Sequence, residues 1–86
     1  YLENRFGVRI ENTLLIVSAE QTELGRFLTF EPLTLCPIDT APIMPELLSA
    51  EETAWLNDYH QRVYDTLSRH LTADESDWLR EACQPI

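Results

Sequence analysis

The sequence predicts a small α+β fold in which two extended segments are followed by two helices. The first half of the chain is rich in β-branched and apolar residues, and Gly25 and Pro32 interrupt it. The second half carries apolar residues at helical spacing, and each run follows a Ser/Thr-x-x-Glu signature. A chain of 86 residues is enough for one small domain, which buries only about 60% of its unfolded surface.

The extended half divides at residues with clear turn chemistry. Residues 6–18 form the first expected strand, and the polar break at 18–25, which ends in glycine, has the form of a hairpin connection. Residues 26–39 are again extended, although Pro32 interrupts them because proline cannot donate to a central ladder. The prolines within 39–48 then indicate irregular chain running over a surface.

Two capping boxes predict where the helices begin. Ser49 with Glu52, and Thr72 with Glu75, place a hydroxyl at the cap and a carboxylate three residues later. The apolar positions of the first helix are Leu56, Tyr59, Val63, Leu67 and Leu71, with Trp55 beside Tyr59. Those of the second helix, which Pro85 ends, are Trp78, Leu79, Ala82 and Cys83. We expect at least partial burial of Trp55, Tyr59, Val63, Trp78 and Leu79.

Composition excludes several classes of partner. The net charge is -9, and all six basic residues are arginines. Such a balance repels phosphate backbones and anionic membrane surfaces, so neither nucleic acid nor a membrane is an expected partner. Cys36 and Cys83 lie far apart without a CxxC motif, and we expect both to be buried free thiols in a reducing compartment. The chain lacks an initiator Met and resembles a piece of a longer protein.

Arg9 and Glu11 are the unusual feature of the first strand. Successive strand side chains point to opposite faces. Residues 8, 10, 14 and 16 share an apolar parity, whereas Arg9, Glu11 and Thr13 share the other. The charged face is either a solvated outer face, which the pattern alone favours, or the lining of a site in which Glu11 is a ligand or base that Arg9 orients.

The remaining chemical candidates have simpler interpretations. His60 and His70 lack the spacing of paired metal ligands, and we expect them on the surface or flank of the first helix. The acidic residues of both first helical turns suit the helix dipole and need no catalytic role. Trp55, Tyr59 and Trp78 are more typical of a core than of a binding platform. No Ser/His/Asp set, Gly-rich phosphate loop or nucleophilic cysteine context is present.

Four motifs in order resemble the C-terminal end of the aminopeptidase P (Xaa-Pro aminopeptidase) family. They are FGVRIEN, FLTFEPLTLCPID, WLNDYH and the terminal WLREACQPI. The resemblance covers essentially the whole chain and is similar to the longer, three-domain type. It implies a pita-bread catalytic fold that holds two divalent metals, usually manganese. It also implies removal of an N-terminal residue that precedes proline.

The resemblance also implies roles for particular residues. Glu11 matches the last of five metal ligands in the family and would bridge both metals. Arg9 matches an arginine that supports the ligands without touching the metals, which would explain the charged parity. The family's other four ligands have no match here, so we expect no tight metal binding by this chain alone. Residues 1–24 would be the last strands of the catalytic domain, and residues 25–86 a C-terminal extension.

The partners implied are the remainder of the catalytic domain, a second copy in a homodimer, and a peptide with proline at its second position. The implied location is the cytoplasm. Such a chain would be inactive alone, although the longer enzyme would be active. The alternative is a free-standing, small acidic module for protein interaction or dimerisation without catalysis.

Overall fold

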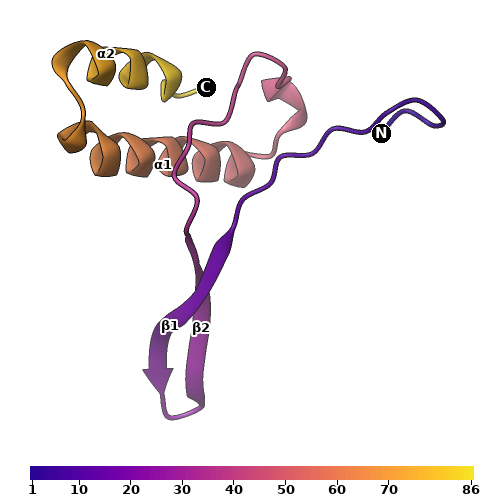
Figure 1. Ribbon diagram of the computed structural model, residues 1–86. Coiled ribbons are helices and arrows are strands. Elements are labelled where there is room, and N and C mark those ends of the chain that lie inside the picture. Colours follow the sequence, from indigo (N-terminus) through magenta and orange to yellow (C-terminus); the bar gives the residue numbers. More distant parts are fainter. The chain divides into compact units, whose positions relative to one another are not determined.

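A computed structural model describes residues 1–86 as a two-stranded hairpin followed by two α-helices (Figure 1). In chain order the elements are β1 (Leu14–Thr22), β2 (Gly25–Pro32), η1 (Pro45–Leu47), α1 (Ala50–Leu67), η2 (Ser68–His70) and α2 (Ala73–Ala82). The expected α+β class is confirmed, with antiparallel strands, an extended segment and two helices. The chain forms two compact units, Tyr1–Thr34 and Leu35–Ile86. The expected division at residues 24 and 25 stays a prediction.

The hairpin is a regular antiparallel pair with one bulge. Ile16 lies opposite Phe30 and Ser18 opposite Leu28, and the register shifts between Ser18 and Glu20. Directly opposite side chains point to the same face. The pairing therefore gathers four apolar residues on one face, Leu14, Ile16, Leu28 and Phe30, whereas Leu15 and Val17 of β1 point to the other face.

The connection between the strands is shorter than the sequence predicted. β1 continues through the polar residues to Thr22, so only Glu23 and Leu24 form the turn. The backbone N–H of Leu24 donates to Thr22 Oγ1 at 3.2 Å, and Gly25 adopts a φ of +131°. Polar side chains occupy this part of the strand because the tip of a hairpin is solvated on both faces, so polarity did not mark its end.

The expectation of a strand from residue 6 is wrong, because β1 begins at Leu14. The backbone N–H of Leu33 donates to the Thr13 carbonyl at 2.8 Å, and this is the last rung of the ladder. β2 ends at Pro32, so residues 7–12 have no neighbouring strand to pair with. A β-branched, apolar sequence becomes a strand only where another strand supplies hydrogen-bond partners.

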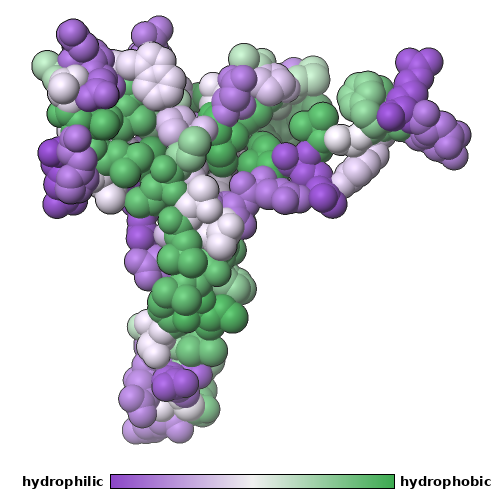
Figure 2. All heavy atoms as spheres, in the orientation of Figure 1, coloured by the Kyte–Doolittle hydropathy of each residue, from purple (hydrophilic) through white to green (hydrophobic).

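The unit Tyr1–Thr34 contains no buried side chain. Figure 2 shows hydrophobic side chains along the hairpin, with hydrophilic ones at its tip. Ile16 and Phe30, which lie opposite each other, are 61% and 64% exposed. A two-stranded hairpin is marginally stable alone, because stability needs further strands or a packed helix. The apolar face of this hairpin is therefore available to be covered.

Both helices begin where the capping boxes predicted. The N–H of Glu52 donates to Ser49 Oγ at 3.1 Å, and the N–H of Ser49 donates to Glu52 Oε1 at 2.9 Å. Thr72 and Glu75 repeat this arrangement at α2, at 3.3 and 2.9 Å. The hydrogen bonds from Ser49 hold the pKa of Glu52 below its usual value, because they favour the charged carboxylate.

The first helix ends at Leu67, earlier than the apolar spacing to Leu71 suggested. The next three residues form η2, and the backbone N–H of Leu71 donates to the Ser68 carbonyl at 3.1 Å. Leu71 still packs against the core because a tighter 3-10 turn also returns the chain to the same side. The helical spacing therefore predicted correctly that Leu71 packs against the core, but it predicted incorrectly that Leu71 belongs to the first α-helix.

The core of the unit Leu35–Ile86 lies between α1 and α2. Its buried members are Tyr59, Val63, Leu79 and Cys83, and Leu35, Ile38, Tyr64, Leu67 and Leu71 pack against them. Burial of Tyr59, Val63 and Leu79 was predicted correctly. Trp55 is 46% exposed and so partly buried, whereas Trp78, at 66% exposed, is mostly open to solvent. Trp55 stacks on Tyr59, with ring centroids 5.4 Å apart, at the edge of the core.

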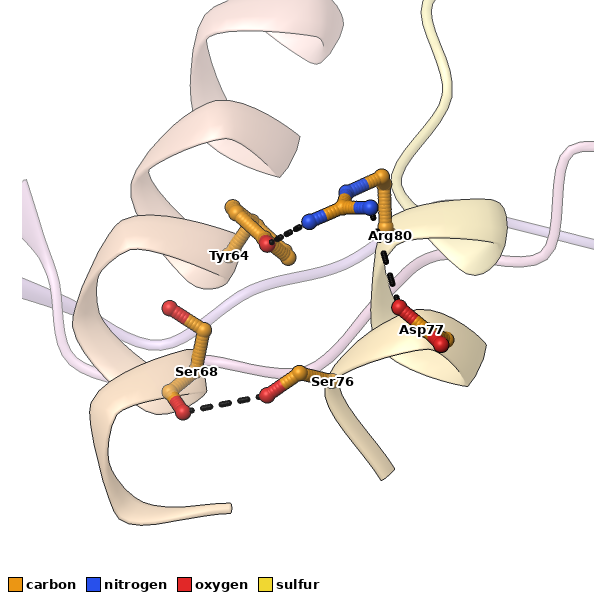
Figure 3. Close-up of polar contacts among 5 residues, drawn as sticks. All are labelled: Tyr64, Ser68, Ser76, Asp77 and Arg80. Carbon is orange, nitrogen blue, oxygen red and sulfur yellow. Dashed lines mark hydrogen bonds and ion pairs between the residues drawn. The ribbon is translucent and has the colours of Figure 1, made fainter. Parts of the chain in front are cut away.

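Polar contacts join the two helices outside the core (Figure 3). Arg80 on α2 donates from Nη2 to the Tyr64 hydroxyl at 2.8 Å, and its guanidinium lies 5.5 Å from the Tyr64 ring centroid. The hydroxyl of Ser76 donates to the Ser68 carbonyl at 3.1 Å. These contacts fix the angle at which α2 returns along α1, because they lie at separate points along α2.

Two neighbouring side chains of α1 hold the segment that precedes the helices. The Tyr59 hydroxyl donates to the Cys36 carbonyl at 2.8 Å and accepts from the Cys36 N–H at 3.2 Å. His60 Nε2 accepts from the Ile38 N–H at 2.9 Å. This stretch has no strand partner, so side chains satisfy amide groups that a sheet would otherwise pair.

The expectation that His60 lies on the surface is wrong, because its side chain is completely buried. His70 is exposed, as predicted. Burial lowers the pKa of His60 below its usual 6.5, because a charged imidazolium loses its hydration there. The Ile38 N–H also occupies the Nε2 lone pair, so a proton at Nε2 would displace that hydrogen bond. His60 is therefore neutral in the folded chain at neutral pH.

We expect Ser49→Ala to lower the free energy of unfolding by about 0.5–2 kcal/mol, because the N–H of Glu52 loses its acceptor. Urea denaturation, followed by circular dichroism, measures the change. Ser68→Ala is the matched control, since the Ser68 backbone carbonyl, which the substitution keeps, accepts from Ser76. Equal midpoints for Ser49→Ala and the unsubstituted chain would contradict the assigned cap.

We expect the free energy of unfolding to fall as pH is lowered from 7.5 to 5. In that range the unfolded state takes up a proton at His60, whereas the folded state, with its lowered pKa, does not. The slope for one such group approaches at most about 1.4 kcal/mol per pH unit. Stability contributed by the lowered pKa values of Glu52 and Glu75 is lost mainly below pH 4.5, so these groups affect only the acid end of this window.

Urea denaturation at several pH values measures this slope in His60→Gln, in which the amide oxygen can still accept from Ile38. His70→Gln is the matched control at an exposed histidine of the same region. The slope between pH 5 and 7.5 is expected to flatten in His60→Gln alone. A slope that persists in His60→Gln and disappears in His70→Gln would contradict the assignment.

Candidate functional site

Arg9 and Glu11 lie in the irregular stretch immediately before β1. Arg9 Nε contacts Glu11 Oε1 at 2.7 Å, and their side chains are 67% and 66% exposed. The two side chains therefore point to a common side, as their shared parity predicted, although the stretch is not a strand. An exposed ion pair typically contributes only about 0–1 kcal/mol to stability. This pair is therefore of interest for the chemistry of its side chains rather than for the stability it adds.

The chain around this pair is held by one local contact and the start of the hairpin. The Asn12 side-chain oxygen accepts from the Thr13 N–H at 2.8 Å. The Thr13 carbonyl in turn accepts from Leu33 on the far side of the hairpin. The amide nitrogen of Asn12 is buried without a hydrogen-bond partner in the chain. Glu11 thus comes directly before a residue anchored to the strand pair.

The donor set of this chain is too small for a metal centre. No three His, Cys, Asp or Glu side chains gather where they could hold an ion. A two-metal site needs several oxygen and nitrogen donors around ions about 3.5–4 Å apart. Glu11 is a single carboxylate, and the two histidines lie in the other compact unit. The 86 residues by themselves therefore do not fit a complete two-metal site.

The two cysteines differ in their surroundings. Cys83 is buried in the core, as predicted, but the prediction for Cys36 is wrong because that residue is exposed. Burial raises the pKa of the Cys83 thiol, and Cys36 acts in the same direction. Both cysteines are free thiols. The structure contains no helix that is both long enough and apolar enough to cross a membrane.

Sequence reasoning missed His60 although a signal for its burial was available. Leu56, His60, Val63 and Leu67 follow one another at spacings of four, three and four residues, which places His60 on the apolar stripe. The interpretation as a surface residue followed from its polarity. The partner that makes its burial possible, the Ile38 N–H, lies 22 residues away and cannot be inferred from the helical pattern.

The antiparallel hairpin followed by a capped helix pair is the arrangement found in the C-terminal region of a family of peptidases. Residues 26–86 match the model of the C-terminal region of peptidase_M24. The chain belongs to this family.

Proteins similar to this chain include longer proteins from animals and plants, two of which are named as aminopeptidases. Over its whole length the chain is 44% identical to the Xaa-Pro aminopeptidase app-1 of Caenorhabditis elegans and spans 15% of that protein. It is 40% identical to Aminopeptidase P1 of Lotus japonicus, of which it spans 14%. It is also 42% identical to Protein pid-5 of Caenorhabditis elegans, of which it spans 9%.

A solved structure shows the same arrangement. The crystal structure of X-prolyl aminopeptidase from Caenorhabditis elegans superposes with a TM-score of 0.81 at 43% sequence identity. The superposition covers all of this chain and 15% of that one. That protein is described as a cytosolic enzyme with a di-nuclear active site. The likeness confirms the expected resemblance and the strand-then-helix fold class.

Proposed function

We propose that this chain is the C-terminal part of a two-metal Xaa-Pro aminopeptidase. The observation that carries this proposal is the 44% identity, over the whole chain, to an Xaa-Pro aminopeptidase. The similar solved structure, described as having a di-nuclear active site, supports it. The chain spans 15% of those proteins, so the activity belongs to the longer protein. Its substrate is a peptide with proline at the second position.

Within that enzyme the Glu11 carboxylate would be one of the ligands that hold two divalent metal ions. Its exposed side chain, and the Arg9 guanidinium 2.7 Å away that can hold it in place, support this role. A carboxylate donor suits manganese, which is the metal we propose. When bound, such a metal pair polarises the scissile bond and stabilises the charge that develops during hydrolysis. Arg9 is a positioning residue, because it acts through Glu11.

The remainder of the catalytic domain is the proposed cover of the hairpin. The unit Tyr1–Thr34 has no core of its own, and its apolar face is exposed along both strands. A solvent-exposed face of this kind is typical of a sheet whose packing partner lies elsewhere. The proposed location is the cytoplasm, which the two free thiols and the description of the solved relative as cytosolic support.

A second function, dimerisation through residues 25–86, is favoured by a separate observation. Trp55 and Trp78 lie on the surface of the helical unit rather than in its core. Tryptophan is enriched at the centres of protein interfaces. In the proposed homodimer this unit would form the interface between the two copies, and it would contribute no catalytic residue. A free-standing interaction module would use the same surface without any peptidase.

We expect Glu11→Ala, made in the full-length parent, to abolish turnover and lower the metal content while the fold is kept. The reason is that a bridging carboxylate neutralises two cations and determines their spacing. Hydrolysis of an Xaa-Pro peptide, metal analysis and circular dichroism measure the three quantities. Glu23→Ala, at the exposed hairpin turn, is the matched control and should retain activity. Near-normal turnover with full metal content in Glu11→Ala would refute the assignment.

We expect the 86-residue chain alone neither to bind Mn²⁺ tightly nor to cleave an Xaa-Pro peptide. It brings one carboxylate to a site that needs several donors, and no cluster of three ligands exists in it. The uncovered hairpin should also recruit other chains, since exposed edges and apolar patches promote association. The net charge of -9 opposes this, although salt screens charges beyond about 8 Å.

Sedimentation velocity in dilute buffer, with a manganese titration alongside, tests both statements. Self-association without saturable metal binding is the expected result. The full-length parent is the positive control for metal binding and peptide hydrolysis. A stable monomer that binds two Mn²⁺ ions with micromolar affinity would contradict the proposal that this chain is an incomplete part of the enzyme.

A further inference from the structure

The proposed peptidase makes no use of the two cysteines, which have opposite environments within the unit Leu35–Ile86. Cys36 is exposed, in the segment before η1, whereas Cys83 is 8% exposed and belongs to the core cluster. An exposed thiol meets reagents in solution, and a buried one does not. A pair of this kind can react in sequence if the segments that carry it lie together.

Tyr59 is the first contact that brings the two segments together. Its hydroxyl bonds both to the N–H and to the carbonyl of Cys36, which holds the backbone of that residue at the Tyr59 ring's polar end. The Tyr59 ring itself is buried in the cluster that contains Cys83. Tyr59 therefore holds the Cys36 backbone and belongs to the same buried cluster as Cys83.

A hollow on the surface of this unit gives a second, independent contact. It measures about 230 Å³ and is lined by Pro37, Ile38, Asp39, Thr40, Trp78 and Ala82. The first four of these residues directly follow Cys36, and Ala82 directly precedes Cys83. The segment after Cys36 thus faces the end of α2 from which Cys83 projects.

The electrostatics of Cys83 agree with this placement. Burial is the main cause of its raised pKa, and the Cys36 thiol adds to it. Two thiols influence each other's ionisation only when they are near neighbours. The raised pKa also lowers the fraction of Cys83 that is thiolate, so the exposed Cys36 reacts first.

We propose that Cys36 and Cys83 form a reversible disulfide in response to an oxidant, with exposed Cys36 reacting first. This inference is independent of the proposed peptidase function. The bond would join the segment at Cys36 to the end of α2, across the site where Tyr59 already holds the backbone. In reducing compartments such disulfides are usually transient and redox-sensing rather than structural.

The chemistry balances with a small-molecule disulfide such as oxidised glutathione as the oxidant. The Cys36 thiolate attacks one glutathione sulfur, so that an S–S bond forms to Cys36 and one glutathione thiolate leaves. The Cys83 thiolate then attacks the Cys36 sulfur and releases the second glutathione. Two protein thiols are oxidised, one oxidised glutathione is reduced to two thiols, and the two protons pass to those leaving groups.

Mass spectrometry after incubation with oxidised glutathione tests the proposal on the 86-residue chain. Denaturing mass spectrometry separates any non-covalent assembly of the chain, and circular dichroism confirms its helices in the same buffer. The expected product is a monomer about 2 Da lighter than the reduced chain, because an intramolecular disulfide forms with loss of two hydrogen atoms. Peptide mapping should then join the peptides that contain Cys36 and Cys83, and dithiothreitol should reverse the change.

Two single variants separate the steps. Cys83→Ala should stop as a glutathione adduct on Cys36, because no second thiol is present to resolve it. Cys36→Ala should form an adduct more slowly by on the order of tenfold, because its remaining thiol is buried and reacts only on local opening. The oxidised chain should also unfold at a higher temperature than the reduced chain, since a disulfide restricts the unfolded state.

Three results would overturn the proposal. The unsubstituted chain could stop as a glutathione adduct, as Cys83→Ala does, which would show that Cys83 cannot reach Cys36. It could form only disulfide-linked dimers at dilute concentration. Cys36→Ala could react with glutathione as fast as Cys83→Ala, which would show that Cys36 does not react before Cys83. The same mapping in the full-length parent decides the question if circular dichroism shows the shorter chain unfolded.

Discussion

The paired hydrogen bonds between the Tyr59 hydroxyl and the Cys36 backbone are the interaction on which the unit Leu35–Ile86 depends. The segment before η1 is extended chain without a strand beside it. Its amide groups would remain unsatisfied against α1 if Tyr59 and His60 did not meet them. Leaving one such buried group without a partner costs about 1–3 kcal/mol. These contacts allow Leu35 and Ile38 to pack against the core that contains Cys83.

The hairpin has the opposite character. Its backbone hydrogen bonds are satisfied along β1 and β2, yet its apolar face finds nothing to pack against within the unit Tyr1–Thr34. Hydrogen bonding without burial gives little net stability, because water offers the same groups equivalent partners. The Arg9–Glu11 pair, the candidate for chemistry, lies in this less stable unit. The proposed role of Glu11 therefore depends on chain that completes both the fold and the donor set.

The extent to which sequence predicted the fold varied with the range of the interactions involved. Both helix starts were predicted correctly, because a capping box is closed by residues three positions apart. The strand prediction failed over residues 7–12, where the sequence is suitable for a strand but no partner strand exists. Exposure of Cys36 and Trp78, and burial of His60, were also missed, because each depends on distant neighbours. The prediction that the Arg9 and Glu11 side chains point to a common side was correct. The alternation of residues from which it came carries no information about whether the backbone pairs with another strand.

The sequence by itself determined the order of strands and helices, the caps and the resemblance that assigns Glu11 its proposed role, because local spacing and motif residues carry that information. The tertiary structure alone decided which polar groups are buried and which segments meet. Val63 and His60 lie on the same apolar stripe, and both are fully buried. Burial of the polar His60 side chain depends on the hydrogen bond that its Nε2 accepts from the Ile38 N–H. A hydrogen bond that closes over 22 residues has no local signature, so it emerges only when the chain is packed.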